Sequence, residues 1–241
     1  MGEGFKCSGC GKCCSKFGDK HYLPLYDWEV EVLLKEAKEK NIKINIKPLK
    51  YFLDKKSGII VVFLYGMFNE PCVFLENNHC SIYKNRPSIC KKFPLGYTPR
   101  MCPKMFNLDC FYICPEFNAR KFMASVLNLK EEELETKGKE PTKLNTATTD
   151  PIFKAFFGEI FDYCTQENMA EMYIGKSIQM LKEKNLIKLR KVSEFDLNKH
   201  KQMNLFDFMI MKGMMNEKSK EFLIKSVTEE DFIENVKRDI E

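Results

Sequence analysis

The sequence Cys7-Ser8-Gly9-Cys10-Gly11-Lys12-Cys13-Cys14 is the feature that sets the fold of the first half of this chain. Its C-x2-C-x2-C-C spacing lets a short loop place successive sulfur atoms on one centre. Gly9 and Gly11 have no side chain, so they can adopt positive φ and point backbone N–H groups at thiolates. We therefore expect residues 5–18 to form a tight loop around a metal, and not a helix.

Cysteines continue through the first half of the chain. Eleven are present in 241 residues, and only Cys164 lies in the second half. The candidate metal ligands are Cys7, Cys10, Cys13, Cys14, Cys72, Cys80, Cys90, Cys102, Cys110 and Cys114. Ten thiols exceed the four that one zinc ion or one four-iron cluster takes, so either two centres are present or one centre and a second group of cysteines. Adjacent Cys13 and Cys14 should diverge in an extended backbone, so one of them is expected to serve elsewhere.

The chain reads as a cytoplasmic protein that does not enter a membrane. Its amino terminus lacks the apolar run of a secretory signal, and its longest apolar run, Ile59–Tyr65, has seven residues against the roughly 20 that span a bilayer. Thiols stay reduced in the cytoplasm, where clustered cysteines hold metal or perform redox chemistry more often than they form disulfides. A redox pair of Cys7 and Cys10 lacks the surrounding βαβ pattern, so metal binding is the favoured interpretation.

The positive charge is concentrated in the cysteine-rich half. Residues 1–118 carry 18 Lys and Arg against 12 Asp and Glu, whereas the remainder carries 21 against 22. Four thiolates around a zinc ion or an oxidised four-iron cluster keep a net negative charge, which nearby basic side chains would offset. No recognisable DNA- or RNA-binding module accompanies the charge, so a nucleic-acid partner is not expected.

The first half should contain one helix, one buried strand and one hairpin. Val30, Leu33, Leu34 and Ala37 recur with helical spacing after a candidate N-cap at Asp27, which predicts a helix that ends near Asn41. The apolar segment 58–66 predicts a buried strand. The segment 72–83 predicts a hairpin that turns at Asn77-Asn78 and brings Cys72 close to Cys80. The chain from there to Pro115 is rich in Pro and Cys, so we expect it to be irregular.

The second half should be mainly helical. Helices are expected at 119–129, from the Asp150-Pro151 N-cap to Cys164, at 169–184, at 203–215 and at 228–240. Cys164 shares an apolar face with several phenylalanines, so we place it in the core and outside the metal site. The polar segment 130–150 has no apolar periodicity and is the expected linker. The predicted fold class is α+β, with a cysteine-rich metal domain at 1–129 that contains a β-hairpin and a mainly helical domain at 151–241.

Three motifs together resemble a known family. They are Cys7 to Cys14, the hairpin from Cys72-Val73-Phe74-Leu75 to Cys80-Ser81-Ile82-Tyr83, and Arg86-Pro87-Ser88-Ile89-Cys90-Lys91-Lys92-Phe93-Pro94. In this order they resemble the YkgJ-type cysteine-cluster family, also called CxxCxxCC, whose domain is described as zinc- or iron-chelating. Flagellin lysine methylases carry a similar motif together with an iron-sulfur cluster. The resemblance covers about residues 5–118, and it departs at Lys91, where the family usually has arginine.

The resemblance implies roles for individual residues. It marks as cluster cysteines Cys7, Cys10, Cys13, Cys14, Cys72, Cys80 and Cys90. The candidates Cys102, Cys110 and Cys114 rest instead on local density and on a C-x3-C-P run that echoes the end of a ferredoxin motif. Arg86 is expected to support thiolates or to bind backbone carbonyls, and His79 is expected to face solvent.

The leading hypothesis is a cysteine-cluster protein that binds an iron-sulfur cluster or zinc and whose helical half docks a protein partner or substrate. Thiolate-only sites suit both metals, but the absence of a second C-x2-C pair favours iron-sulfur, of the 4Fe-4S type, over zinc. The alternative implied by the resemblance is a protein lysine methyltransferase that uses S-adenosylmethionine. Neither a G-x-G-x-x-G turn nor a C-x3-C-x2-C motif is present to support it. Whether the chain is an enzyme is left open, and no catalytic residue is assigned.

Overall fold

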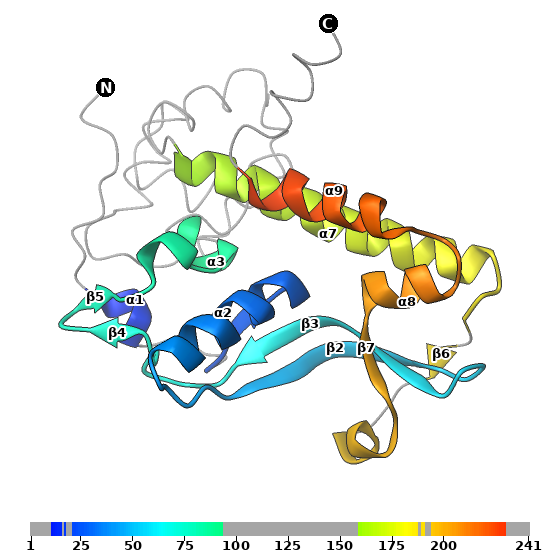
Figure 1. Ribbon diagram of the computed structural model, residues 1–241, viewed down its shortest axis with the longest axis horizontal. Helices are drawn as coiled ribbons and strands as arrows, with labels where there is room; N and C mark the ends of the chain where they lie inside the picture. The colour runs from blue at the N-terminus through cyan, green and yellow to red at the C-terminus, as the bar shows by residue number, and fades with distance from the viewer. Residues whose placement is uncertain are drawn as a thin grey trace, which may run out of the picture. The chain divides into compact units, whose positions relative to one another are not determined.

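The chain forms two compact units in the computed structural model. The structure describes residues 11–15, 17, 21–93, 159–187, 189–190 and 194–229. One unit contains Met1–Phe17 and Phe74–Asn168, and the other contains Gly18–Val73 and Met169–Glu241. Helices and β-strands occur together, which confirms the predicted α+β class (Figure 1). The expected linker at 130–150 lies outside the described residues, so a domain division at that point stays a prediction.

The unit formed by Gly18–Val73 and Met169–Glu241 is built on a mixed sheet. In the described part of the chain its strands are β1 (Leu23–Leu25), β2 (Ile46–Asp54), β3 (Ile59–Met67), β6 (Leu189–Arg190) and β7 (Gln202–Asn204). The strand order is β1-β3-β2-β6, and β7 pairs with β3 in parallel while the other pairs are antiparallel. Strand β3 is the predicted buried strand, shifted by one residue, and its residues Ile60, Val61 and Val62 are fully buried.

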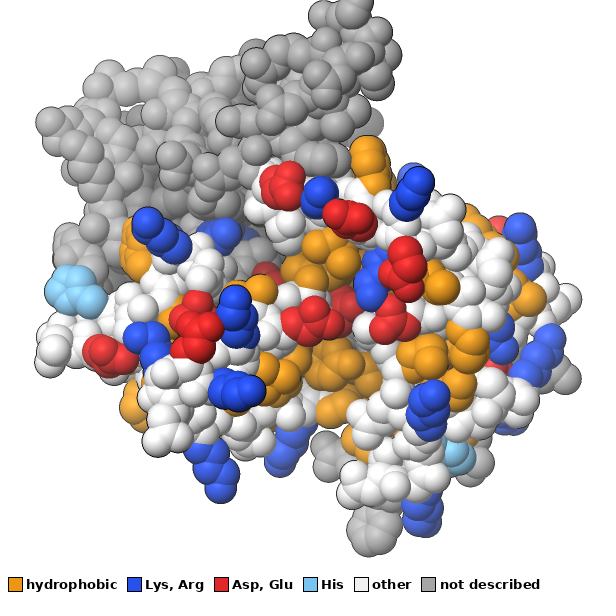
Figure 2. Space-filling model, viewed as in Figure 1, with side chains coloured by type: hydrophobic (Ala, Val, Ile, Leu, Met, Phe, Trp, Pro, Cys, Tyr) orange, Lys and Arg blue, Asp and Glu red, His pale blue; other side chains and the backbone are white. Residues whose placement is uncertain are grey.

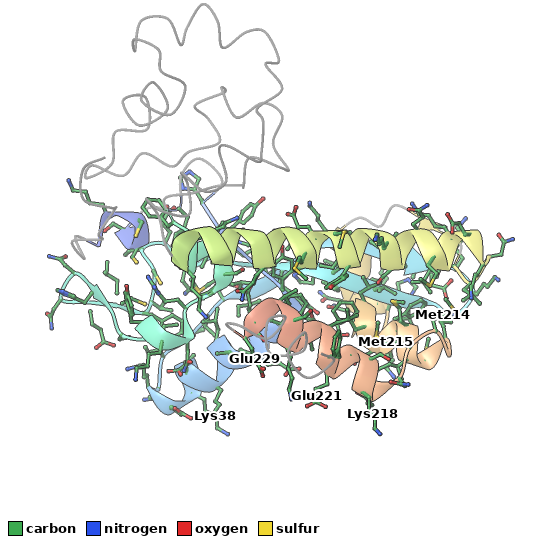
Figure 3. The ribbon with its side chains drawn as sticks, turned by 90° about the horizontal axis from the view of Figure 1, so that it is seen from above. Lys38, Met214, Met215, Lys218, Glu221 and Glu229 are labelled. Carbon is green, nitrogen blue, oxygen red and sulfur yellow. The ribbon has the colours of Figure 1, made fainter. Side chains whose placement is uncertain are left out.

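Helices cover this sheet. They are α2 (Asp27–Glu39), the part of α7 (Glu159–Glu183) from Met169 onward, α8 (Leu205–Met211) and α9 (Glu217–Thr228). The side chains of Asn204 and Asn216 accept hydrogen bonds of 2.8 Å from backbone N–H groups in the first turns of α8 and α9, so each acts as an N-cap. Helix α9 runs alongside α7 in both views of the ribbon (Figures 1 and 3). None of the described helices is both long and apolar enough to cross a membrane.

One hydrophobic cluster joins the helices to the sheet. Its buried members are Phe52, Ile59, Val61, Leu181, Ile187, Leu205, Phe206, Phe208 and Met209. The ring of Phe208 on α8 meets Phe52 on β2 edge to face, with centroids 6.3 Å apart and an interplanar angle of 87°. Burying such a side chain contributes roughly 1.5–3 kcal/mol, so this cluster accounts for much of what holds α7 and α8 on the sheet.

Several expected elements have different boundaries in the structure. Helix α2 has Tyr26 as its N-cap and Asp27 as its first residue, and Leu34 of the expected apolar face is 49% exposed. The expected helix at 203–215 is a strand followed by the shorter α8, because Gln202–Asn204 pairs with β3 before Asn204 caps the helix. Helix α9 and strand β2 have no counterpart among the sequence predictions.

The other expected helices fall partly or wholly outside the described residues. The segments 119–129 and 230–241 are not described, so the helices expected there stay predictions. Helix α7 is continuous across Cys164 and the predicted helix at 169–184. The side chain of Cys164 is not described, so its predicted place in the core is untested.

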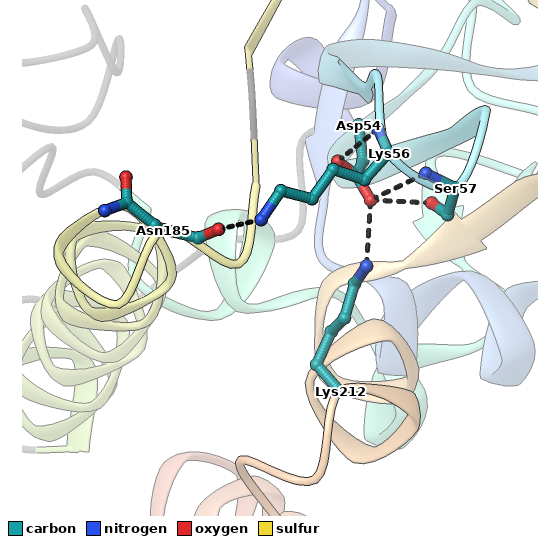
Figure 4. Close-up of polar contacts among 5 residues, drawn as sticks. All are labelled: Asp54, Lys56, Ser57, Asn185 and Lys212. Carbon is teal, nitrogen blue, oxygen red and sulfur yellow. Dashed lines mark hydrogen bonds and ion pairs between the residues drawn. The ribbon is translucent and has the colours of Figure 1, made fainter.

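A buried ion pair links the β2–β3 turn to the end of α8 (Figure 4). Asp54 is fully buried, and its carboxylate accepts hydrogen bonds from Ser57 Oγ at 2.7 Å, from Lys56 N at 3.0 Å and from Lys212 Nζ at 2.9 Å. Burial alone would raise the pKa of Asp54, but hydrogen bonds from Ser57, Lys212 and the Lys56 N–H lower it to about 2. The charged form therefore stabilises the folded state at neutral pH.

The change Asp54→Asn should lower the free energy of unfolding at pH 7 by about 3 kcal/mol, because Lys212 loses its carboxylate partner in a mostly buried position. In the wild type this contribution is present above about pH 4 and is lost as the pH falls towards 2, since the pKa of Asp54 is lowered on folding. Urea unfolding at pH 7 and pH 3 measures both effects. The exposed neighbour Lys55, changed to Met, is the control; a cost below about 1 kcal/mol for Asp54→Asn at pH 7 contradicts the assignment.

Candidate metal centre

The cysteine motif continues into one turn of helix. Helix α1 (Lys12–Ser15) begins after Gly11, which has a φ of 69°. The Gly11 carbonyl accepts hydrogen bonds of 3.0 Å from the backbone N–H of Cys14, from the N–H of Ser15 and from Ser15 Oγ. These bonds close one helical turn, so the prediction that no part of 5–18 is helical is wrong at Lys12–Ser15.

The second element is the hairpin predicted around Asn77-Asn78. Strands β4 (Leu75–Glu76) and β5 (His79–Cys80) pair with Leu75 opposite Cys80. Asn77 and Asn78 have φ values of 49° and 63°, as a two-residue turn with positive φ at both positions requires. The hairpin and its turn are therefore confirmed. Cys72 belongs to the other compact unit, so its expected proximity to Cys80 stays a prediction.

Gly11 packs directly against the hairpin turn. A Cβ atom added to Gly11 would lie 3.0 Å from the backbone oxygen of Asn78 and 3.2 Å from the Leu75 side chain. A side chain at this position would have to displace the Asn78 backbone or the Leu75 side chain by a few tenths of an ångström, and the positive φ also favours glycine. This contact seats the segment that carries Cys13 and Cys14 on the hairpin that carries Cys80.

Cys13 and Cys14 point their sulfur atoms toward each other. The two Sγ atoms lie 4.0 Å apart. Divergence was expected for an extended backbone, whereas both residues lie in α1. Zn–S bonds are about 2.3 Å long, so two sulfurs on one tetrahedral zinc ion lie about 3.8 Å apart. The observed separation therefore fits two thiolates that share a single ion.

The thiol of Cys13 ionises easily. The hydrogen bond from Cys14 is the main cause that lowers its pKa to about 6, assisted by backbone N–H groups and the charge of Arg86, although partial desolvation of the sulfur acts in the opposite direction. Burial raises the pKa of Cys80, and the negative charge of Cys13 adds to this, while Arg86 and the Ile82 backbone act against it. A low-pKa thiolate is the form that binds metal, so Cys13 is poised as a ligand at neutral pH.

Arg86 follows the hairpin in the chain and precedes the short helix α3 (Ser88–Lys91), which carries Cys90. Its Nε donates a hydrogen bond of 2.9 Å to the carbonyl of Tyr83, in the 3-10 turn η2 (Tyr83–Asn85). The expectation that Arg86 binds a backbone carbonyl is confirmed. His79 is exposed, as predicted, with Nδ1 2.8 Å from the Asn77 carbonyl oxygen.

Half of the candidate cysteines lie in the described part of the chain. Cys13 is exposed, and the partly buried ones are Cys14, Cys72, Cys80 and Cys90. The candidates outside the described residues are Cys7, Cys10, Cys102, Cys110 and Cys114. Within the described residues, no three His, Cys, Asp or Glu side chains converge on one point. The structure thus brings Cys13 and Cys14 together beside Cys80, and the complete ligand set stays a prediction.

Ser81 is a residue of the site that the sequence did not single out. Ser81 follows Cys80 directly, and its buried hydroxyl oxygen has no hydrogen-bond partner in the part of the chain that the structure describes. A buried hydroxyl without a partner costs roughly 1–3 kcal/mol, and a hydroxyl can donate to a thiolate sulfur. A thiolate is one acceptor that can satisfy such a hydroxyl, so the unpaired group is compatible with an anionic centre nearby.

Comparison with known proteins identifies this region. Residues 6–121 match the family model CxxCxxCC, which is described as a "Putative zinc- or iron-chelating domain". The matched segment contains all ten candidate cysteines and confirms the resemblance drawn from the three motifs. No curated protein and no solved structure matches the chain.

The change Gly11→Ala should destabilise the cysteine-rich unit and reduce its metal content, because the new Cβ would meet the Asn78 backbone. Gly58→Ala is a matched control: Gly58 has the same φ of 69°, but nothing lies within 4 Å of its added Cβ. The positive φ should lower the free energy of unfolding of both variants by about 1–2 kcal/mol. The contact with Asn78 should lower it by roughly a further 1 kcal/mol or more in Gly11→Ala alone. Urea unfolding and metal analysis compare them. If the two variants have the same free energy of unfolding and the same metal content, Gly11 does not pack against the hairpin.

The change Cys14→Ala should raise the pKa of Cys13, since the hydrogen bond from Cys14 is the main cause that lowers it to about 6. In metal-free protein, the rate of Cys13 alkylation as a function of pH should therefore have a higher midpoint in the variant than in the wild type. Peptide mass spectrometry after timed iodoacetamide treatment gives the midpoint. Cys90→Ala should leave it unchanged, and an unchanged midpoint in Cys14→Ala contradicts the proposed hydrogen bond.

Proposed function

We propose that the CxxCxxCC segment, residues 6–121, binds a metal ion through cysteine thiolates, with Cys13 and Cys14 as two ligands of the same ion. The observation that carries this proposal is the 4.0 Å separation of their sulfur atoms. Two further features support it, namely the low pKa of Cys13, at about 6, and the buried Ser81 hydroxyl without a partner. Cys80, on the hairpin that Gly11 packs against, stays a candidate for a further ligand, since within the described residues no third metal-binding side chain converges with Cys13 and Cys14.

The shared ion favours zinc, or another single ion, over the 4Fe-4S cluster that the cysteine spacing alone suggests. Four cysteines hold the four irons of such a cluster, so each iron takes one protein sulfur and two sulfurs do not meet on one iron. Tetrahedral zinc takes all of its sulfurs on one centre. A two-iron cluster also places two cysteines on each iron, and acid-labile sulfide distinguishes it from zinc.

A bound ion would supply free energy of binding that also stabilises the fold, since its ligands come from separate segments. Cys13 and Cys14 lie on α1 and Cys80 lies on β5, so an ion held by them would join α1 to the hairpin. Gly11 and the Asn77-Asn78 turn bring these segments together in the chain itself. The metal would therefore bind a largely arranged pair of segments, and the role we propose for it is structural.

The remaining functional expectations stay predictions. Docking of a partner or substrate by the C-terminal half is one, and use of S-adenosylmethionine, which only the resemblance to flagellin methylases implies, is another. Cytoplasmic location is a third. On the face drawn in Figure 2, basic and acidic side chains are interspersed, and the expectation that no nucleic acid binds stays a prediction.

Protein purified without oxygen should contain zinc in stoichiometric amount, with no acid-labile sulfide and no broad visible absorption. Cys13→Ser and Cys14→Ser should each lose most of the metal, because each variant removes a ligand. Cys164→Ser, the same substitution outside the matched segment, should retain it. Metal and sulfide analysis measures all four proteins.

Each part of the proposal can fail separately in this experiment. The absence of both zinc and iron from the wild type would overturn metal binding. Iron with matching sulfide would keep metal binding and overturn the choice of zinc. Full metal retention in either Cys13→Ser or Cys14→Ser would overturn the shared ion.

A further inference from the structure

The first turns of α2 and α8 meet at one place on the edge of the sheet. Strand β1 ends at Leu25, which pairs with Tyr65, and β7 ends at Asn204, which pairs with Val62. Since β1 is antiparallel and β7 is parallel to β3, these two strands run toward each other along the edge of β3 that β2 does not use. Their partners on β3 are three residues apart, which is roughly 10 Å, so the helices that follow begin close together.

Ring stacking and an ion pair join these two helix starts to α9. Trp28 on α2 stacks on Tyr26 and on Phe206 of α8, with ring centroids 4.8 Å and 6.0 Å apart and interplanar angles of 13° and 10°. Asp207, in the first turn of α8, pairs with Lys220 of α9, whose Nζ lies 2.5 Å from Oδ1. We call this group of five side chains and their neighbour Asp27 the three-helix joint.

Asp27 is the first residue of α2, directly before Trp28, and it is partly buried. Burial is the main cause that raises its pKa to about 6, and the charge of Asp207 adds to this, while the charge of Lys220 and the backbone N–H groups of Asp27 and Trp28 lower it. Burial also raises the pKa of Tyr65 to about 12, and the charges of Asp27 and Asp207 contribute. The ring stack and the shared edge of β3 thus place both carboxylates at one joint.

Each element at the three-helix joint contributes titratable groups. Those that face Asp27 from other elements are Asp207 of α8, Lys220 of α9 and Tyr65 of β3. On α2 itself, Glu29 Oε2 accepts a hydrogen bond of 2.9 Å from Tyr26 N; on α9, Glu217 acts on Lys220; and α7 adds Tyr173 to the cluster around Tyr26 and Trp28. Strand β1, with the sequence Leu-Pro-Leu, adds none. Asp27 and Asp207 therefore share Lys220, which is 20% exposed.

We propose that Asp27 makes the three-helix joint responsive to protons: protonation of its carboxyl group tightens the contact of α2 with α8 and α9, and ionisation loosens it. An ionised Asp27 gains hydration when the joint opens, because in the closed joint it is partly buried and shares Lys220 with Asp207. The stabilising effect of the proton is present at low pH and is lost as the pH rises through about 6, since the pKa of Asp27 is raised on folding. The joint lies in the unit of Gly18–Val73 and Met169–Glu241, so this inference does not depend on metal binding.

Trp28 is the only tryptophan of the chain, so the fluorescence of the full-length protein reports on the three-helix joint directly. The test titrates this fluorescence from pH 5 to pH 8 in the wild type and in Asp27→Asn. The control is Glu31→Gln, which removes a carboxylate from an exposed position one turn further along α2. Amide hydrogen exchange in the first turn of α2, corrected for the intrinsic effect of pH, measures how often the joint opens.

The wild type and Glu31→Gln should show a fluorescence midpoint near pH 6, and Asp27→Asn should show none. The opening equilibrium of the wild type should be roughly 10-fold larger at pH 7.5 than at pH 5, because each unit by which a pKa is raised on folding corresponds to a tenfold change. In Asp27→Asn the opening equilibrium should be the same at both pH values. A wild type without a midpoint in this range, or a midpoint that persists in Asp27→Asn, overturns the proposal.

Two further variants keep the test informative if Asp27→Asn does not fold. Lys220→Gln should move the fluorescence midpoint to higher pH, because the lysine charge lowers the pKa of Asp27, and Asp207→Asn should move it to lower pH, because the charge of Asp207 raises that pKa. Both variants break the same ion pair, so a merely structural role of the pair would change both proteins in the same way. Midpoints that shift in the same direction, or that do not shift, overturn the proposal.

Discussion

The arrangement of the cysteine-rich unit depends on the close approach of Gly11 to the turn at Asn78. A Cβ at this position would lie only 3.0 Å from the Asn78 backbone oxygen, so the contact is tight, and it sets where helix α1 starts relative to the hairpin. This contact brings the cysteine-bearing segments together, since Cys13 and Cys14 lie two and three residues after Gly11 and Cys80 lies two residues after Asn78. The three positive-φ residues Gly11, Asn77 and Asn78 therefore help to place α1 against the hairpin.

The other unit is held together in a different way. Its stability comes from the apolar cluster around Phe52 and Phe208 and from the buried pair of Asp54 and Lys212. Removal of both charges in favour of apolar side chains is often neutral in proteins, so the pair contributes to the placement of the α8 end as much as to stability. Neither feature involves a cysteine. The chain thus combines a unit whose described part is organised by turns with a unit organised by ordinary packing.

Part of this structure could be predicted from the sequence. The α+β class, strand β3 and the hairpin at Asn77-Asn78 follow from local signals, namely an apolar run and a pair of turn-forming asparagines. Helix α1 was missed because its first turn depends on donors that converge on the Gly11 carbonyl, and not on propensity. Strands β6 and β7 were missed because such short strands exist only through their partners, β2 and β3. In the site, the sequence spacing indicated the cysteines. Only the structure shows that the sulfur atoms of Cys13 and Cys14 lie close together and that the Ser81 hydroxyl lacks a hydrogen-bond partner among the described residues.

The parallel pairing of β7 with β3 affects how the chain folds during synthesis. Ile60 pairs with Gln202, so the partner of this strand edge is made 142 residues later. At typical translation speeds the delay is on the order of 10 s, during which β1 can cover only the far end of the same edge. An apolar strand with an open edge is an aggregation hazard, and contacts between such distant residues slow folding. A ribosome-bound chain that has not reached β7 is therefore the species most in need of a chaperone.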